Sequence, residues 1–207
     1  MIYSLVIGIL VSYLLGNLNG AVCISALMHD DVRSHGSGNA GLTNFIRNYG
    51  AGRAISVILI DAGKAVLACL VTGLLLEPYD MGAAGAALGG TAVMLGHVFP
   101  ALLGFKGGKG ILSGFFVALM LDWRIALLIL AVFAIAYGLT QYVSLGSVLG
   151  AAAFGVGFVL LHSDDLTVMI CGIVMSALAI YMHRENIVRL LKGQERKTNL
   201  FGRGKGK

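Results

Sequence analysis

Two lysines and four glycines stand within seven residues, in the segment Gly104-Phe105-Lys106-Gly107-Gly108-Lys109-Gly110. An apolar run begins directly after it, so the glycine N–H groups and the ammonium charges are expected at the N-terminus of a helix. That combination binds phosphate in proteins. A flexible basic loop is the alternative, because glycine interrupts regular structure and lysine collects on the inner side of membranes. Glycine follows Gly108-Lys109 where a nucleoside triphosphate loop needs serine or threonine, so a phosphate monoester suits the segment better.

A second glycine-rich segment, Gly36 to Gly41, is followed by an arginine one helical turn beyond a threonine. It matches G-x-G-x-x-G, but a dinucleotide site requires a preceding strand, and here an apolar run of membrane type precedes it. Short hydroxyl and amide side chains beside glycine backbone could clamp an oxyanion, with bidentate hydrogen bonds from the arginine. An ordinary turn and helix cap are the alternative. The candidate residues are Ser37, Asn39, Thr43, Asn44 and Arg47.

A third polar segment, residues 183–195, follows the last apolar run. His183 and Asn186 are three residues apart, so on a helix they share one face, where both could bond one reacting oxygen. The alternative is a basic interfacial segment that ends a membrane span.

Asp61 and Lys64 stand inside an apolar run, where ionisable residues are costly and are usually paired or functional. Their i, i+3 spacing lets them bond each other. Two interpretations stay open: a self-neutralising structural pair, and a lysine that reaches an anion site.

The composition is that of an integral membrane protein. Of the 207 residues, 57% are hydrophobic and only 12% are charged, which is too little polar surface to cover a soluble globule. The net charge of +5 does not indicate nucleic-acid binding, because the basic residues stand where they orient membrane helices. The three cysteines lie far apart inside apolar runs, so we expect buried hydrophobic residues and neither disulfides nor a metal site.

Seven apolar runs predict an all-α fold with about seven transmembrane helices. Runs 111–121 and 146–161 are shorter than the ~20 residues that cross a bilayer, so some segments are expected to be short or half-buried. Of the 15 Lys and Arg residues, all but Lys64 and Arg124 fall on one side, which places the N-terminus outside and the C-terminus in the cytoplasm. The three polar segments then share the cytoplasmic face. The runs are 2–28, 54–76, 83–103, 111–121, 125–139, 146–161 and 166–182.

Residues 1–195 are expected to form a single multi-span domain, and 196–207 a basic, disordered cytoplasmic tail. No internal repeat is visible in the sequence, which weakens an inverted-repeat transporter. Glycines with small-xxx-small spacing at 82–90 and 146–150 are expected to let helices pack closely.

Together, the polar segments resemble those of a known family, the bacterial acyl-phosphate:glycerol-3-phosphate acyltransferases (PlsY). They occur in the family's order and spacing, and Asp61, Lys64 and Tyr142-Val143-Ser144-Leu145 extend the likeness over most of the chain. One departure is Gly16 to Gly20, where the family's first helix more often ends in a Pro-containing turn. The family's three motifs look like Gly36 to Asn44 with Arg47, His97 to Pro100 with Phe105 to Gly110, and His183 to Asn186 with Arg189, Leu190, Gly193 and Glu195.

The resemblance implies a reaction in which the hydroxyl of sn-glycerol 3-phosphate attacks the carbonyl of a fatty acyl phosphate. The products are 1-acylglycerol 3-phosphate (lysophosphatidate), a precursor in phospholipid biosynthesis, and inorganic phosphate. None of the five histidines is followed by aspartate five positions on, so the His-x4-Asp pair of acyl-CoA-dependent acyltransferases is absent. The proton acceptor is either His183 or the acyl phosphate itself, and a Ser37 acyl-enzyme is a less favoured variant. Catalytic roles are expected for Ser37, Arg47, His183 and Asn186.

The glycine-lysine loop, helped by Arg47, is expected to hold the glycerol phosphate anion, while Ser37, His183 and Asn186 hold the acyl phosphate and its developing oxyanion. Glu195 is expected to be structural. No cofactor, metal, nucleic acid or obligate protein partner is expected, and the site should lie on the cytoplasmic face of the plasma membrane. A phosphate or organic-anion transporter is the alternative function. Substrate-binding roles are expected for Asn39, Thr43, Asn44, Lys64, Lys106, Gly107, Gly108, Lys109, Gly110 and Ser144.

Overall fold

The structure, a computed structural model, describes residues 1–198. This part of the chain folds into α-helices joined by short links and contains no strand, so the predicted all-α fold is confirmed. The helices are α1 (Ile2–Asn17), α2 (Gly20–Leu27), α3 (Leu42–Tyr49), α4 (Ala51–Leu76), α5 (Gly82–Val98), α6 (Ile111–Leu121), α7 (Trp123–Thr140), α8 (Val143–Leu161), α9 (Leu166–Met182) and α10 (Arg184–Leu191).

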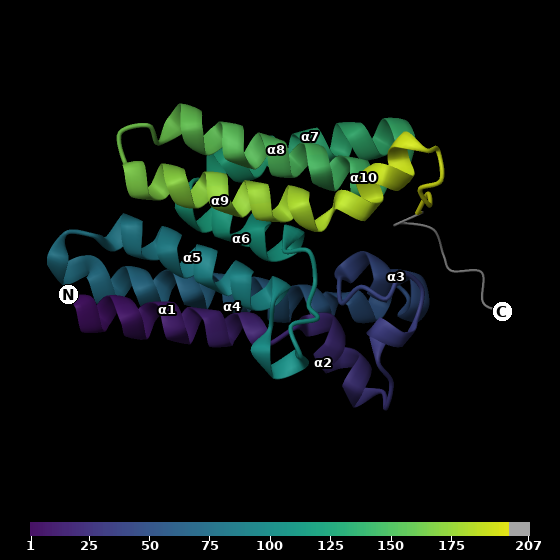
Figure 1. The fold of residues 1–207 in the computed structure, drawn as a ribbon, viewed down its shortest axis with the longest axis horizontal. Coiled ribbons are helices and arrows are strands. Elements are labelled where there is room, and N and C mark those ends of the chain that lie inside the picture. Colours follow the sequence, from purple (N-terminus) through teal and green to yellow (C-terminus); the bar gives the residue numbers. More distant parts are fainter. Residues whose placement is uncertain (199–207) are drawn as a thin grey trace.

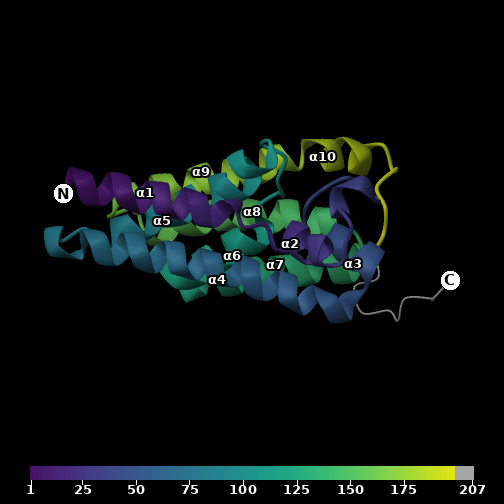
Figure 2. The same ribbon diagram turned by 90° about the horizontal axis from the view of Figure 1, so that it is seen from below.

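The long helices form two groups that lie side by side (Figure 1). One group contains α1, α4 and α5, which contact one another, and the other contains α7, α8 and α9, in which α8 contacts both neighbours. Helix α6 lies between the groups and contacts α4, α5 and α7, while α5 also contacts α9. The small helices α2, α3 and α10 gather at the end of the molecule opposite the N-terminus (Figures 1 and 2).

The helices have the lengths and surfaces of membrane spans. Helices α4, α5, α7 and α8, the first two together with short 3-10 extensions, are long and apolar enough to cross a bilayer. The pairs α1–α2 and α9–α10 pass the same test only together and bend by 44° and 55° between their members. Large apolar side chains such as Leu59 and Leu160 are 66% and 72% exposed, as suits helices that face lipid.

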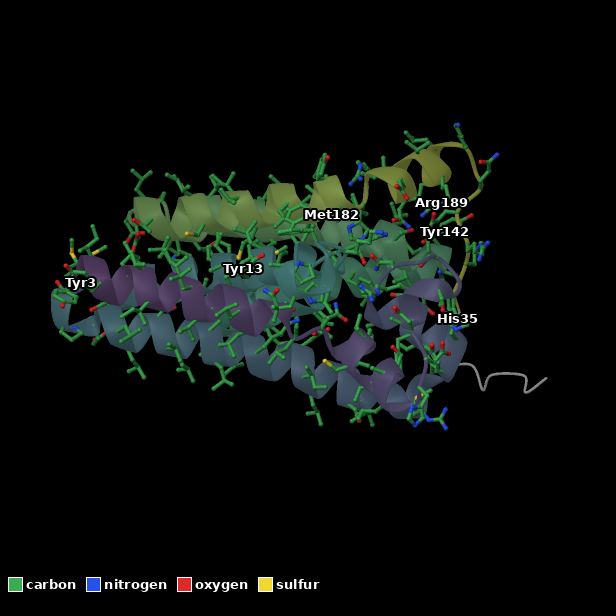
Figure 3. All side chains as sticks on the ribbon, turned by 60° about the horizontal axis from the view of Figure 1, so that its bottom comes forward. Tyr3, Tyr13, His35, Tyr142, Met182 and Arg189 are labelled. Atoms are coloured by element: carbon green, nitrogen blue, oxygen red, sulfur yellow. The ribbon has the colours of Figure 1, made fainter. Side chains whose placement is uncertain are left out.

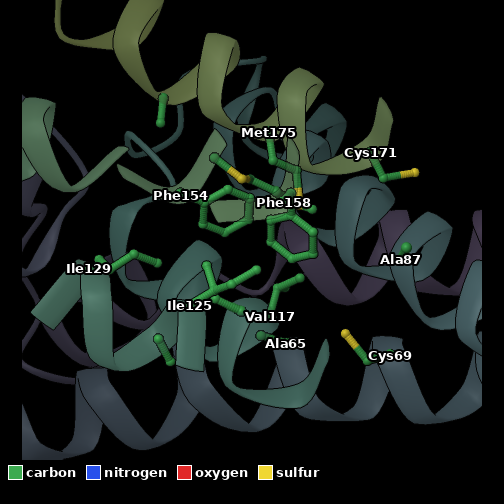
Figure 4. Close-up of a cluster of buried hydrophobic side chains, with 14 of the residues drawn as sticks. Ala65, Cys69, Ala87, Val117, Ile125, Ile129, Phe154, Phe158, Cys171 and Met175 are labelled. Atoms are coloured by element: carbon green, nitrogen blue, oxygen red, sulfur yellow. The ribbon is translucent and has the colours of Figure 1, made fainter. Parts of the chain in front are cut away.

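The short helix α6 is stabilised by its surroundings. Its Val117 and Ala118 side chains are completely buried in a core that includes Phe154, Phe158 and Met175 (Figure 4). The rings of Phe154 and Phe158 lie 4.9 Å apart between centroids. A helix of 11 residues is too short to span hydrocarbon alone, so its neighbours must shield it.

Glycines allow the helices of the first group to approach closely. A β-carbon on Gly16 of α1 would lie 2.3 Å from the Val93 carbonyl oxygen of α5, and one on Gly96 would lie 2.1 Å from the Tyr13 carbonyl oxygen. The predicted packing role of the 82–90 glycines is confirmed at Gly89, where a β-carbon would lie 2.4 Å from the Ala68 carbonyl oxygen. In the other group, a β-carbon on Gly146 would lie 2.8 Å from the Phe133 ring, so the 146–150 glycines also serve packing.

The first apolar run, predicted as continuous over residues 2–28, is broken between α1 and α2. The Asn19 side chain caps α2 by accepting a hydrogen bond of 3.0 Å from the Val22 N–H. Its amide also donates to the Ala40 carbonyl, at 2.9 Å, so the break ties the membrane helices to the glycine segment 36–41. This is the place where the sequence departs from the Pro-containing turn of the family it resembles.

Candidate active site

A cavity of about 810 Å³ opens between the two helix groups. Polar side chains from all three predicted segments line one end of it. Apolar side chains from α5 to α9 line the other, among them Met94, Ile129, Phe133, Phe154 and Met175. The end of the molecule with the polar groups carries His35, Tyr142 and Arg189, opposite Tyr3 near the N-terminus (Figure 3). The polar lining includes Ser37, Asn39, Thr43, Asn44, Arg47, Lys109, Gly110, Ser144, His183, Asn186, Arg189 and Glu195.

The glycine segment 36–41 is shaped by Asn44, which is only 2% exposed. Its amide nitrogen lies 3.0 Å from each of three carbonyl oxygens, those of Val32, His35 and Asn39, and its oxygen accepts from the Ser37 N–H at 3.0 Å. Gly36 adopts φ +61°, a left-handed conformation that suits glycine. The Asn44 amide therefore makes its hydrogen bonds within the loop that carries Ser37 and Asn39, and not to the cavity.

The glycine-lysine loop divides into two parts. Gly107 and Gly108 pack against the end of α5, where the Gly108 N–H donates to the His97 carbonyl at 3.1 Å and a β-carbon on Gly107 would lie 2.0 Å from the same oxygen. Gly110, with φ +78°, turns the chain into α6. Lys109 and Gly110 line the cavity, whereas Lys106 is exposed and lies outside the lining. One lysine of the loop is thus placed to meet an anion.

Lys109, Asn186, Ser144 and Arg189 are joined through Glu195. The Lys109 ammonium donates to the Asn186 amide oxygen, and the Asn186 amide nitrogen donates to Glu195 Oε1 at 2.8 Å. The Ser144 hydroxyl also donates to Oε1, at 2.9 Å, and Arg189 Nε donates to Oε2 at 2.7 Å. One carboxylate therefore holds groups from α8 and α10 beside the cavity.

Burial and neighbouring charges set the charge state of this network. Burial, assisted by the positive charge of Arg189, lowers the pKa of Lys109 to about 8. Burial alone would raise the pKa of Glu195, but the hydrogen bonds from Arg189, Asn186 and Ser144 outweigh it and hold that pKa below its usual value. Glu195 is therefore ionised near neutral pH, and Lys109 is close to its titration range.

His183 is positioned with its proton-accepting nitrogen available. It is 4% exposed, lines the cavity, and its Nδ1 lies 2.8 Å from the Ala179 carbonyl oxygen. A carbonyl only accepts hydrogen bonds, so Nδ1 carries the hydrogen and Nε2 of the neutral ring keeps its lone pair. The ring can then accept a proton at Nε2.

Arg47 of α3 also lines the cavity. Its Nε donates to Thr198 Oγ1 at 2.9 Å, and its Nη2 donates to the same oxygen and, at 3.4 Å, to the Arg196 carbonyl. Residues 196–198 of the predicted tail therefore make specific contacts. The remainder of that tail, 199–207, lies outside the described residues.

Lys64 contacts Asp61 and the break between α1 and α2 rather than the cavity. Its ammonium lies 2.8 Å from Asp61 Oδ1 and 2.7 Å from both the Leu18 carbonyl oxygen and His97 Nδ1. Asp61 and His97 line the inner part of the cavity, while Lys64 does not. Of the two interpretations left open by the sequence, the geometry favours a neutralised structural pair. The bond from Lys64 to the Leu18 carbonyl also stabilises the break between α1 and α2.

Two residues that support the site were not predicted from the sequence. Asn19 supports the glycine segment, and its signal was available: an asparagine inside an apolar run requires a buried partner. Thr198 holds Arg47, but it stands in a basic glycine-containing segment that gives no sign of an ordered contact. The apolar end of the cavity was also missed, because residues such as Phe154 and Met175 have the same composition as ordinary membrane-helix core.

Similarity to known proteins agrees with this arrangement. A sequence model of the family described as glycerol-3-phosphate acyltransferase matches residues 6–193. Glycerol-3-phosphate acyltransferases of Thermoanaerobacter sp. (strain X514) and Clostridioides difficile (strain 630) are each 38% identical to the chain. The first alignment covers 91% of this chain and 92% of the relative, and the second covers 95% and 96%.

The fold matches solved structures equally well. A crystal structure of the integral membrane glycerol 3-phosphate acyltransferase PlsY in its glycerol 3-phosphate form superposes with a TM-score of 0.84 at 32% identity, covering 96% of this chain and 100% of that one. The lysophosphatidic acid form of PlsY gives a TM-score of 0.83 at 32% identity, covering 95% and 96%. With this similarity along most of its length, the chain belongs to the glycerol-3-phosphate acyltransferase family.

Proposed function

We propose that the chain transfers the acyl group of a fatty acyl phosphate to the 1-hydroxyl of sn-glycerol 3-phosphate. One observation carries the proposal: a single cavity has cationic and hydrogen-bonding groups at one end and apolar side chains at the other. The polar end suits two phosphate-bearing substrates, and the apolar end suits the hydrocarbon chain that one of them carries. The absence of a His-x4-Asp pair in the sequence supports acyl phosphate over acyl-CoA as donor.

The glycerol 3-phosphate anion is assigned to Lys109, Arg47 and the N–H groups at the start of α6. Lys109, in the loop before α6, and Arg47, on α3, both line the cavity, so we assign one phosphate to the two cations together. The N-terminus of α6 adds unpaired N–H donors directly after Gly110. Binding the anion at this end leaves the glycerol hydroxyl directed toward the remaining polar groups, Ser37, His183 and Asn186.

In the reaction, the 1-hydroxyl oxygen of glycerol 3-phosphate forms a bond to the acyl carbon, and the bond from that carbon to the phosphate oxygen breaks. The electron pair of the broken bond leaves with inorganic phosphate. We assign to Ser37 and Asn186 the hydrogen bonds to the oxygen on which negative charge develops. His183 Nε2 is one acceptor for the hydroxyl proton, and the phosphate dianion of the donor substrate is the other.

A direct assay tests the function. Purified protein in detergent micelles receives an acyl phosphate and glycerol 3-phosphate, and lysophosphatidate and inorganic phosphate are measured. We expect the two products in equal amounts, and no lysophosphatidate when acyl-CoA replaces acyl phosphate. A folded protein that makes no lysophosphatidate from acyl phosphate would contradict the proposal.

The proton acceptor can be assigned with His183→Gln, which keeps a hydrogen-bonding side chain but cannot take a proton at neutral pH. If His183 is the base, kcat should fall by about 10²–10⁴-fold. A fall of less than tenfold would favour the substrate phosphate as acceptor. Trapping a stable acyl-protein adduct in a single turnover would instead indicate the Ser37 acyl-enzyme.

A further inference from the structure

The segment 195–198 bridges the two walls of the cavity. On one wall, Glu195 accepts hydrogen bonds from α8 and α10, the Thr198 N–H donates to the Gln141 carbonyl at 3.1 Å, and the Tyr137 hydroxyl donates to the Thr198 carbonyl at 2.9 Å. From the other wall, Arg47 of α3 donates to Thr198 Oγ1. The backbone of Thr198 is therefore fixed to α7 while its side chain holds a residue of α3.

The contacts with Thr198 and Arg196 use Nε and Nη2 of the Arg47 guanidinium, and within residues 1–198 no group accepts a hydrogen bond from Nη1. Thr198 Oγ1 accepts from Nε, at 2.9 Å, and from Nη2. A guanidinium has five N–H donors in a rigid plane. Nη2 also donates to the Arg196 carbonyl, at 3.4 Å, so the two hydrogens on Nη1 are the ones left for a ligand. Thr198 is only 6% exposed, whereas Arg47 belongs to an exposed part of α3, so the fixed partner is the threonine.

We propose that Thr198 is a positioning residue for the glycerol 3-phosphate site, acting through Arg47. The inference rests on the acyltransferase function proposed above, and it concerns a residue beyond the region that the family sequence model matches, which ends at residue 193.

The physical reason is conformational freedom. An arginine side chain on an exposed surface has many rotamers, and ordering it on an arriving anion costs binding free energy. The Thr198 hydroxyl orders the side chain before the anion arrives and aims its free edge into the cavity. This ordering should increase the affinity for glycerol 3-phosphate and leave that for the acyl chain unchanged, because Arg47 is assigned to the anion and not to the apolar end of the cavity.

The test compares Thr198→Val, which is isosteric but has no hydroxyl, with Thr198→Ser, which keeps the hydroxyl, each in the full chain. We expect Thr198→Val to raise KM for glycerol 3-phosphate about tenfold, the effect of losing one hydrogen bond to a charged group. KM for the acyl phosphate and kcat should change less than about twofold. Thr198→Ser should restore KM to within about twofold of the unmodified protein. Thr198→Ala gives the same readout if valine at this position prevents folding.

Repeating the substitution in an Arg47→Met variant distinguishes an effect of Thr198 through Arg47 from a general loss of structure. In Arg47→Met, adding Thr198→Val should leave KM for glycerol 3-phosphate unchanged, because the side chain that threonine orders is gone. An independent tenfold rise in that background would overturn the proposal, as would an unchanged KM for Thr198→Val alone. A lower KM for Thr198→Val would mean that the threonine competes with the substrate for Arg47, which also contradicts it.

Measuring glycerol 3-phosphate binding tests the role of Thr198 independently of whether the protein catalyses the proposed reaction. Glycerol 3-phosphate should raise Tm of the unmodified protein and of Thr198→Ser, and raise it less in Thr198→Val. If the unmodified protein binds glycerol 3-phosphate but makes no lysophosphatidate, the proposed function fails while the role of Thr198 remains measurable. Equal Tm shifts in all three proteins, with normal activity, would reject the role of Thr198 alone.

Discussion

Lys109 is the cation whose charge depends most directly on pH in the working range. Its pKa is lowered to about 8, first by burial and then by the charge of Arg189. A lowered lysine pKa means that the positive charge is present below about pH 8 and is lost as the pH rises through that value. We therefore expect kcat/KM for glycerol 3-phosphate to fall about tenfold per pH unit above this pH, because kcat/KM reports the ionisation of the free enzyme.

Substitutions at the two lysines of the loop check this assignment. Lys109→Met should lower kcat/KM by about 10²–10³-fold, as expected for loss of a donor to a reacting anion, and should remove the fall above pH 8. Lys106 is the matched control because it stands in the same loop but is exposed and outside the cavity lining, so Lys106→Met should have a much smaller effect. Equal effects at both positions would show that general loop charge, and not the buried ammonium, binds the anion.

Glu195 links stability to acid pH. Its pKa is held below the usual value of 4.5, so the folded state favours the ionised form. The resulting stabilisation is present above about pH 4.5 and is lost as the pH falls through the lower pKa of the folded protein. We expect Tm to decrease on acidification by more in the unmodified protein than in Glu195→Gln, which has no charge to lose.

The same substitution should lower stability at neutral pH by about 1–3 kcal/mol, because Arg189 and Asn186 lose a charged acceptor. Glu185→Gln is the control, since the Glu185 side chain is 77% exposed and its oxygen lies 3.9 Å from Arg189. Thermal unfolding in detergent between pH 3 and pH 8 gives both quantities. If Glu185→Gln and Glu195→Gln behave alike, the hydrogen-bond network does not stabilise the fold.

At the scale of elements, the contact between α1 and α5 depends on two glycines that face each other. Because a β-carbon on Gly16 would lie 2.3 Å from the Val93 carbonyl oxygen, and a backbone oxygen cannot move aside, Gly16→Ala must force the helices apart. We expect a loss of about 1–3 kcal/mol, measured by unfolding in mixed detergent. Gly138→Ala is the control, because no atom lies within 4 Å of a β-carbon on Gly138 of α7. A Gly16→Ala variant as stable as Gly138→Ala would mean that the two helices can separate freely.

The boundaries of the elements were largely predictable, and the breaks were not. The run predicted at 111–121 coincides with α6, Ile111–Leu121, because apolar composition reports contact with lipid or core. The break between α1 and α2 was not predicted, although the polar residues Asn17 and Asn19 flank Leu18 there. At the break, the Leu18 carbonyl accepts a hydrogen bond from Lys64, 46 residues away along the chain. A pattern read over neighbouring residues cannot predict so distant a partner.

For the whole molecule, the three polar segments could be predicted to meet on one side, because the distribution of basic residues orients the helices. The cavity lining bears out that they come together. The sequence could not show which of their residues face the cavity. Asn44, Lys64 and Lys106 are of the same residue types as side chains that bind anions. Only three-dimensional contacts show that Asn44 bonds its own loop, Lys64 bonds Asp61 and the helix break, and Lys106 faces outward.

The distribution of charge along the molecule predicts its orientation in the membrane. The site end carries Lys106 and the basic residues of α3 and α10, while the opposite end carries the acidic links at Asp80 and Asp164. The positive-inside rule therefore predicts that the site faces the cytoplasm, where a charged glycerol phosphate is available without crossing the bilayer. Single cysteines replace Lys106, Asp80 or Asp164, all exposed residues, in a variant whose Cys23, Cys69 and Cys171 are alanine. A membrane-impermeant maleimide added to intact cells should label Asp80→Cys and Asp164→Cys, and label Lys106→Cys only after the membrane is permeabilised. Labelling of Lys106→Cys in intact cells, with the other two protected, would place the site outside and contradict the predicted orientation.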